Sequence, residues 1–166
     1  MRNTIYALAM FAVTFSFMGC PYSSKVTLDE NPSEKVNATY FGNYEKKGSS
    51  TYNYRISKET ETLYKIEEIS NSNKSSIYLY YGYTTTIGGT QFLVTYQENK
   101  NGGSPDKYYF YKLEGTKSGS MFTLFEVTEA ISEEFTTTKE LKNFISKYKD
   151  LSFFYNKTEL KFYRLD

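Results

Sequence analysis

Acidic side chains are the main groups in this sequence that could do chemistry, because the 166-residue chain contains no histidine. That absence removes Ser-His-Asp triads, Cys-His dyads and the commonest zinc and haem ligands. Two adjacent carboxylate pairs remain, Glu67-Glu68 and Glu133-Glu134. Neighbours on a strand point to opposite faces, so Glu67 and Glu68 cannot readily face one substrate. Glu133-Glu134 falls in a charged linker. We therefore expect a non-catalytic protein that uses no metal and no cofactor.

The single thiol, Cys20, stands at the end of an apolar run. The chain starts with Met1-Arg2-Asn3, and residues 5–18 carry no charge. A span across a bilayer needs about 20 apolar residues, which is more than this run offers. A basic start, a short apolar stretch and a small residue at its end are typical of a secretory signal peptide. An ordinary signal peptide followed by an unpaired cysteine is the alternative.

The residues Phe17-Met18-Gly19-Cys20 resemble the lipobox of bacterial lipoproteins. The resemblance implies that residues 1–19 are a lipoprotein signal peptide, that cleavage occurs just before Cys20, and that the thiol carries a diacylglyceryl group. One acyl chain anchors a protein only marginally, whereas several anchor it stably. We therefore expect the lipid bilayer as a partner through Cys20. Because Pro21 follows the cysteine, the resemblance favours the outer membrane, facing the periplasm.

Composition limits the remaining partners and the domain count. Arg2 leaves with the signal peptide, after which basic and acidic side chains balance, so no electrostatic argument favours nucleic acid. Without another cysteine the fold must rest on packing alone. Residues 20–38 are polar and contain two prolines, which predicts a lipidated cysteine followed by a flexible tether. Residues 39–166 then form a single β-domain.

Strand patterns fill the chain from residue 39 to residue 127. Apolar and polar residues alternate, and Gly- and Asn-containing turns separate the segments. The predicted strands are 39–45, 51–57, 62–69, 76–83, 90–96, 107–114 and 120–127. The spacing predicts a mainly β fold, an antiparallel meander that forms a barrel or sandwich of about eight to nine strands.

One amphipathic helix interrupts the strands near the C-terminus. Within residues 137–148, Leu141, Phe144, Ile145 and Tyr148 form one apolar stripe at helical spacing. Thr137 and Glu140 have the spacing of a capping box. We expect this helix to lie against the sheet. After it, residues 152–165 read as a closing hairpin around Asn156-Lys157, so the helix precedes the last hairpin.

The segment "YFGNYEKKG" resembles the first strand of small lipocalin-like envelope domains, which carry a Gly-x-aromatic sequence that helps to plug the barrel floor. In this chain the sequence is Gly42-Asn43-Tyr44. The resemblance implies a barrel with an internal cavity for a small apolar ligand. A plain sandwich and a barrel with a filled core are the alternatives.

Aromatic residues are unusually frequent, with 18 tyrosines and 13 phenylalanines. They occur on both faces of segments 76–83 and 107–114, whereas a half-exposed strand should have one polar face. The strands could be covered on both sides, tyrosine could serve as a half-polar surface residue, or an aromatic strip could bind a ligand. The residues predicted for such a strip are Tyr78, Tyr80, Tyr108 and Phe110.

Two classes of function follow from these observations. The first is a membrane-anchored, non-catalytic envelope lipoprotein that binds a small apolar ligand or glycan. The alternative is a protein-interaction component of the envelope, such as an assembly subunit, an inhibitor or an immunity-type factor. A lipid-sized internal cavity would favour the first class, and a filled core with an exposed apolar patch would favour the second.

Overall fold

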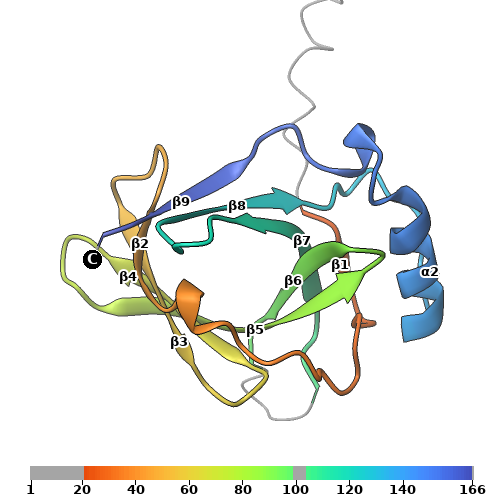
Figure 1. Ribbon diagram of the computed structural model, residues 1–166, viewed down its shortest axis with the longest axis horizontal. Coiled ribbons are helices and arrows are strands. Elements are labelled where there is room, and N and C mark those ends of the chain that lie inside the picture. Colours follow the sequence, from red (N-terminus) through yellow and green to blue (C-terminus); the bar gives the residue numbers. More distant parts are fainter. Residues whose placement is uncertain (1–20, 99–103, 166) are drawn as a thin grey trace, which may run out of the picture.

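The chain folds into a closed antiparallel β-barrel with an α-helix on its outer wall. The computed structural model describes residues 21–98 and 104–165. Strands β2 to β9 follow one another around the barrel, and β2 pairs with β9 to close the ring (Figure 1). The predicted fold class is therefore confirmed, and of the two architectures left open the barrel is the one formed.

The strands of the barrel follow the predicted alternation closely. They are β2 (Gly42–Lys46), β3 (Tyr52–Lys58), β4 (Tyr64–Ser70), β5 (Ser76–Ile87), β6 (Thr90–Tyr96), β7 (Tyr108–Gly115), β8 (Met121–Glu126) and β9 (Leu160–Arg164). The first of them begins later than expected, because residues Ala38–Tyr40 form the 3-10 turn η1. The strand β5 runs further than expected, to Ile87, because Thr84 and Thr85 continue the extended backbone after Gly82.

Two apolar clusters lie on opposite sides of the barrel wall. Each strand points alternate residues inward and outward. The interior cluster draws on strands all around the ring and contains Tyr44, Ile56, Tyr64, Leu93, Leu113, Phe122, Leu124 and Phe162. The exterior cluster joins the outer faces of β5, β6 and β7 to the helix and the N-terminal segment, and contains Tyr22, Leu28, Tyr83, Ile87, Phe92, Val94, Phe110, Val127, Leu141, Ile145 and Phe154.

Aromatic rings fill the interior of the barrel. Phe122 and Phe162 stack with their ring centroids 4.8 Å apart. Tyr54 packs edge-on against Phe162 at 5.2 Å, and Tyr44 packs edge-on against Phe122 at 4.9 Å. A cavity of about 20 Å³ remains beside Phe122. A cavity of that size holds about one water molecule, whereas pockets for small-molecule ligands measure roughly 300–1,000 Å³. The interior is therefore a packed core.

One end of the barrel is closed by η1 and by Arg164 of β9. The Arg164 Nη2 atom donates to the carbonyl oxygens of Thr39 and Phe41 at 2.7 and 2.6 Å, and it lies 2.9 Å from the Tyr44 hydroxyl. Tyr44 is fully buried and donates to the Gly119 carbonyl oxygen at 3.1 Å. Gly119 has a φ of +68°, and a Cβ there would lie 2.0 Å from the Thr39 carbonyl oxygen, so only glycine fits. These contacts fasten η1 across the barrel end.

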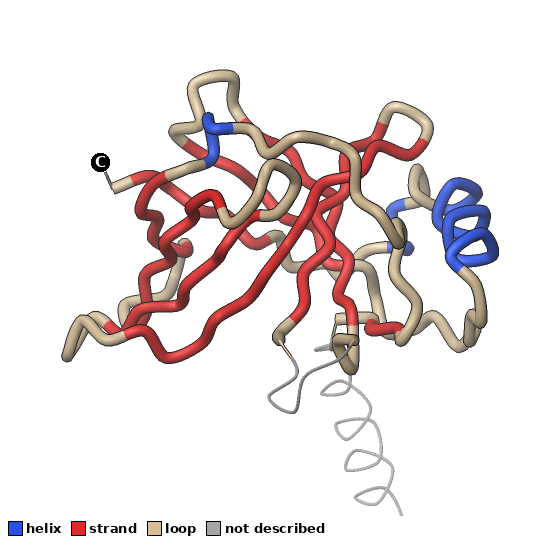
Figure 2. The backbone as a smooth tube through the Cα atoms, turned by 90° about the horizontal axis from the view of Figure 1, so that it is seen from below, coloured by secondary structure: helices blue, strands red, loops and turns tan. Residues whose placement is uncertain are grey.

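The helix α2 (Thr138–Tyr148) forms as the sequence predicts and lies against the outer wall (Figure 2). The capping box is present: the Thr137 hydroxyl accepts from the Glu140 N–H, and the Glu140 carboxylate accepts from the Thr137 N–H. Leu141 and Ile145 are buried in the exterior cluster. The apolar stripe and the N-terminal segment together cover Tyr83 and Ile87 of β5, Phe92 and Val94 of β6, and Phe110 of β7, which explains the apolar outer face at these positions.

The segment that precedes the barrel is packed, so the prediction of a flexible tether through residues 20–38 is wrong for the described part, from Pro21 onward. Residues Ser23–Ser24 form the short strand β1, which pairs with the start of β7. Tyr22 and Leu28 are buried in the exterior cluster. Complete burial of a leucine contributes about 1.5–3 kcal/mol, which offsets part of the entropy lost by ordering the segment.

The predicted closing hairpin at residues 152–165 is also wrong, because only its second arm forms a strand. Residues Ser152–Phe154 form the 3-10 turn η2, and Tyr155 makes an isolated bridge to Val127. The strand β9 instead pairs with β8 and β2 on its two sides. Closure of the barrel occupies both edges of β9, so no edge is left for a hairpin partner.

Candidate functional site

We call the barrel end opposite η1 the mouth. At the mouth β2, β4, β6 and β8 end, and β3, β5, β7 and β9 begin. Residues that pair directly across two strands point to the same face. Tyr54 pairs with Glu68, and Tyr111 pairs with Glu126. Because Tyr54 and Tyr111 belong to the interior cluster, both carboxylates lie on the inner wall.

The inner wall at the mouth is rich in tyrosine. Tyr80 pairs with Ile66 of the interior cluster, and Tyr109 is two residues before Tyr111 on β7, so both point inward. The inner-wall residues at the mouth are Lys46, Tyr54, Glu68, Tyr80, Thr95, Tyr109, Tyr111 and Glu126. This set, which we call the mouth ring, combines aromatic rings, hydroxyl groups and two carboxylates with one ammonium group.

The Glu68 carboxyl of the mouth ring has a raised pKa. Burial raises its pKa above the ordinary value of 4.5, and this effect outweighs the attraction of Lys46 and the hydrogen bonding of Tyr54, which both lower the pKa. A carboxyl with a raised pKa is a common feature of functional sites, although packing alone can produce one. The sequence gives no reason to single out Glu68 from its neighbour. In the structure Glu68 lies on the inner wall, whereas Glu67 lies on the outer face of the barrel, 3.7 Å from the Lys65 ammonium group.

Three tyrosines of the mouth ring, Tyr54, Tyr80 and Tyr111, have a pKa raised above the ordinary value of 10. Burial, with a smaller contribution from the nearby Glu68 carboxyl, raises the pKa of Tyr54 to about 12. Burial also raises the pKa of Tyr80 and of Tyr111, with smaller contributions from Glu68 and Glu126 respectively. Neutral hydroxyls both donate and accept hydrogen bonds, whereas carboxylates only accept. The mouth ring therefore offers both donors and acceptors of hydrogen bonds.

The four residues predicted to bind a ligand do not come together. Tyr80 belongs to the mouth ring, and Tyr78 lies at its rim, half exposed, with the two rings 6.3 Å apart. Tyr108 and Phe110 lie on the outer face of β7, where Tyr108 packs against the exterior cluster and Phe110 is fully buried in it. Phe110 is thus a core residue. Sequence reasoning missed Tyr109 and Tyr111, because an aromatic run gives no sign of which face is inside.

Two outer grooves flank the N-terminal segment. One, of about 710 Å³, runs beside Pro21 and includes Glu133 and Glu134 in its lining, where both carboxylates are exposed. The other, of about 420 Å³, lies beside Tyr83 and Tyr108. Both grooves exist because the N-terminal segment lies over the barrel wall.

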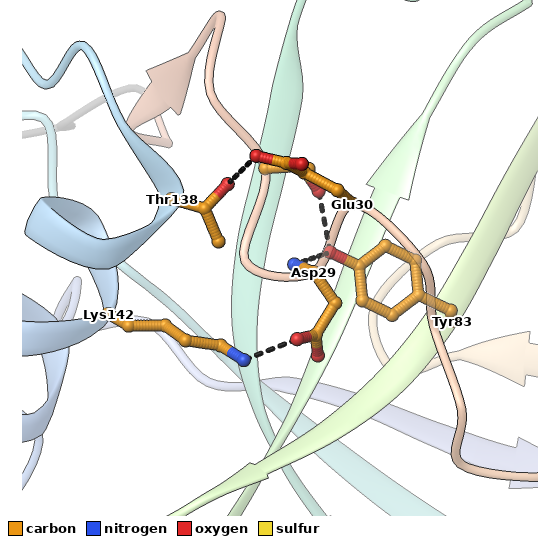
Figure 3. A network of polar contacts seen from close by, with 6 residues as sticks. Asp29, Glu30, Tyr83, Thr138 and Lys142 are labelled. Atoms are coloured by element: carbon orange, nitrogen blue, oxygen red, sulfur yellow. Dashed lines mark hydrogen bonds and ion pairs between the residues drawn. The ribbon is translucent and has the colours of Figure 1, made fainter.

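A polar network fixes the N-terminal segment to the barrel and the helix. Tyr83 of β5 accepts from the Asp29 N–H at 2.8 Å and lies 2.5 Å from the Thr27 hydroxyl. Asp29 forms an ion pair with Lys142 of α2. The Thr138 hydroxyl donates to Glu30 at 3.3 Å. Figure 3 shows these residues converging from three elements. Each of these side chains has a partner within the network, which indicates a structural role.

Other kinds of site find no support in the described part of the chain. Across residues 21–98 and 104–165, no group of three or more acidic, histidine or cysteine side chains is placed to hold a metal ion. Among the same residues no helix has the length and apolar character needed to cross a bilayer. The predicted lipidation residue, Cys20, lies outside the described residues.

Comparison of the chain with models of protein families, with curated proteins and with solved structures found no match.

Proposed function

We propose that this protein is a non-catalytic envelope lipoprotein, anchored through acylated Cys20, whose barrel binds glycans at the mouth ring. The observation that carries the proposal is the contrast between the two parts of the barrel lumen. Aromatic rings pack the interior around a cavity of about 20 Å³. At the mouth, tyrosines and two carboxylates line the inner wall.

A saccharide is the ligand class that suits this wall. The flat apolar faces of sugar rings pack on aromatic rings, and their hydroxyls hydrogen-bond to carboxylates and to tyrosine hydroxyls. Ligand sites commonly combine aromatic walls with a few placed polar groups. A small apolar ligand, the other option left open by the sequence, would need space inside the barrel, and the packing of Phe122 and Phe162 leaves none of that size.

Binding of saccharides can be measured through tyrosine fluorescence, because the chain contains no tryptophan. We would titrate the full lipidated protein in detergent with soluble oligosaccharides of glucose and of N-acetylglucosamine. Tyr80→Ala should weaken binding by at least about tenfold, equivalent to about 1.4 kcal/mol. Tyr81→Ala is the matched control, because Tyr81 is the next residue on β5 and points outward.

Binding that survives Tyr80→Ala, or that is lost equally in Tyr81→Ala, would contradict a site at the mouth. A complete lack of response to every saccharide would contradict glycan binding itself. Thermal unfolding of each variant is measured in parallel, so that a lost site is not mistaken for a lost fold.

A protein-interaction role is the second candidate, and one surface observation favours it. Phe153 of η2 is 71% exposed, and Leu151 beside it is 39% exposed. Exposed apolar groups of this kind can mark protein contacts, although single exposed residues are common. Crosslinking in the native envelope, compared between the parent protein and Phe153→Ser, distinguishes this role. A protein crosslink that depends on Phe153 and not on Tyr80 would favour it over glycan binding.

A further inference from the structure

The N-terminal segment enters the barrel at the mouth end. The strand β1 pairs with the first two residues of β7, Ser23 with Tyr109 and Ser24 with Tyr108. Pro21 bridges to Thr128, which follows the end of β8. Because β7 begins and β8 ends at the mouth, Pro21 also lies there.

No flexible residues separate Cys20 from the first residues that contact the barrel, Pro21 and Tyr22. Cys20 is bonded directly to Pro21, and consecutive Cα atoms are about 3.8 Å apart, so the site of acylation is next to the packed segment. The Tyr22 N–H donates to the Val127 carbonyl oxygen at 2.8 Å, and the Tyr22 side chain is buried. A flexible tether of about eighteen residues would have a reach of roughly 25 Å and would leave the orientation free. The packing of residues 21–37 removes that freedom.

From this geometry we propose that acylated Cys20 holds the barrel with its mouth end nearer to the phospholipid bilayer than its closed end, and with the mouth ring still open to solvent. The inference rests on the acylation in the proposed function and adds an orientation to it. The acyl chains enter the lipid beside Pro21, and the nearest face of the protein is the mouth end. The closed end, with η1 and the β7–β8 turn, then points away from the membrane.

The surface at the mouth end suits this position. Ile77 and Tyr78, at the start of β5, are 43% and 50% exposed. Tyrosine is favoured at membrane interfaces, where its ring meets apolar groups and its hydroxyl meets water. Charges of both signs occur at this end, including Lys47 and Glu129, so the acyl chains supply the attraction and charge contributes little.

The orientation can be tested with one label at each end of the barrel. Acylation consumes the only natural thiol, so an introduced cysteine is unique. Lys47→Cys places a fluorophore in the β2–β3 turn at the mouth, and Lys117→Cys places it in the β7–β8 turn at the closed end. Both lysines are exposed turn residues, which makes the two variants a matched pair. The acylated protein is reconstituted into phosphatidylethanolamine and phosphatidylglycerol vesicles that carry headgroup nitroxides.

We expect the label at position 47 to be quenched several-fold more strongly than the label at position 117. Insertion of about twenty Gly/Ser residues between Cys20 and Pro21, with a reach of roughly 25 Å, should abolish that difference while the protein stays membrane-bound.

Failure of the proposed orientation can be distinguished from failure of the proposed acyl anchor. Equal quenching at the two positions, or stronger quenching at position 117, in protein whose mass shows acylated Cys20 would overturn the orientation and leave the anchor standing. A mass that shows no acyl group on Cys20 in protein from the native envelope would overturn the anchor, and the orientation with it.

Discussion

At the scale of single residues, tyrosine hydroxyls complete the backbone hydrogen bonding of an irregular segment. Tyr83 accepts from the Asp29 N–H, and Tyr64 accepts from the Asn37 N–H at 2.6 Å. Both N–H groups belong to the segment that crosses the barrel wall and has no strand partner there. A buried backbone N–H without a partner is costly, so each hydroxyl stabilises the packed segment. Part of the tyrosine excess is therefore structural.

Removal of one such hydroxyl should cost stability. Tyr83→Phe keeps the ring in the exterior cluster but leaves the Asp29 N–H without its acceptor, which should lower the free energy of unfolding by about 1–3 kcal/mol. Tyr78→Phe, at a half-exposed position, should change it by less than about 0.5 kcal/mol. Urea denaturation measures both. Equal effects in the two variants would contradict the role given to the Tyr83 hydroxyl.

Glu68 should make stability depend on pH in an unusual direction. Burial raises its folded pKa above 4.5, so the folded carboxyl binds a proton at a higher pH than the unfolded one. The resulting stability is fully present below the unfolded pKa and is lost as pH rises through the folded pKa. Glu68→Gln should therefore be more stable than the parent at pH 7, and the gain should vanish near pH 4.

The control for this prediction is Glu67→Gln, on the outer face, where no gain is expected. Thermal unfolding across the pH range provides the measurement. A Glu68→Gln variant that is less stable than the parent at pH 7 would mean that the charged carboxylate is itself stabilised in the mouth ring.

At the scale of elements, the sequence predicted the strands from their periodicity and the helix from its apolar stripe and capping box. The alternation of the strands and the capping box of α2 are local signals, and both are confirmed. The packed N-terminal segment was missed because its average composition is polar, and burial there depends on a few apolar residues such as Tyr22 and Leu28. Which face of β7 is inside depends on barrel closure, a long-range event. The predicted aromatic strip is therefore divided, with Tyr78 and Tyr80 on the inner side of the wall and Tyr108 and Phe110 on its outer face.

The N-terminal segment should behave as part of the folded domain. Leu28 is fully buried, so Leu28→Ala should lower the free energy of unfolding by about 2–5 kcal/mol. Lys35→Ala, at an exposed position of the same segment, should have little effect. Chemical denaturation of the two variants tests the contrast. An unchanged midpoint for Leu28→Ala would show that the segment is a free tether in solution.

At the scale of the whole molecule, a filled interior and a tightly attached N-terminus act together. The packed lumen leaves a cavity of only about 20 Å³, so the proposed glycan contact is confined to the mouth, and the bridge from Pro21 to Thr128 places the start of the packed segment at the same end. Neither property could be inferred from the sequence, because both depend on how distant strands close the ring.

Buried tyrosines should make the whole barrel sensitive to alkali. Burial raises the pKa of Tyr54 and of Tyr83 to about 12 in the folded state. In the unfolded chain tyrosine ionises near pH 10. The stability from these residues is complete below about pH 10 and is lost as pH rises towards about 12. Absorbance at 295 nm should show a group of late-titrating tyrosines whose ionisation coincides with loss of β-sheet circular dichroism. Titration of every tyrosine near pH 10 with the fold intact would contradict this.

The measurement that tests the central claim most directly is photo-crosslinking in the native envelope, with a benzophenone side chain placed at position 80 or at position 81. These neighbours on β5 face the mouth ring and the outer wall respectively. A barrel that acts through its mouth should yield adducts with saccharide mass at position 80 and none at position 81. Adducts made of polypeptide alone, or equal saccharide adducts at both positions, would contradict the account.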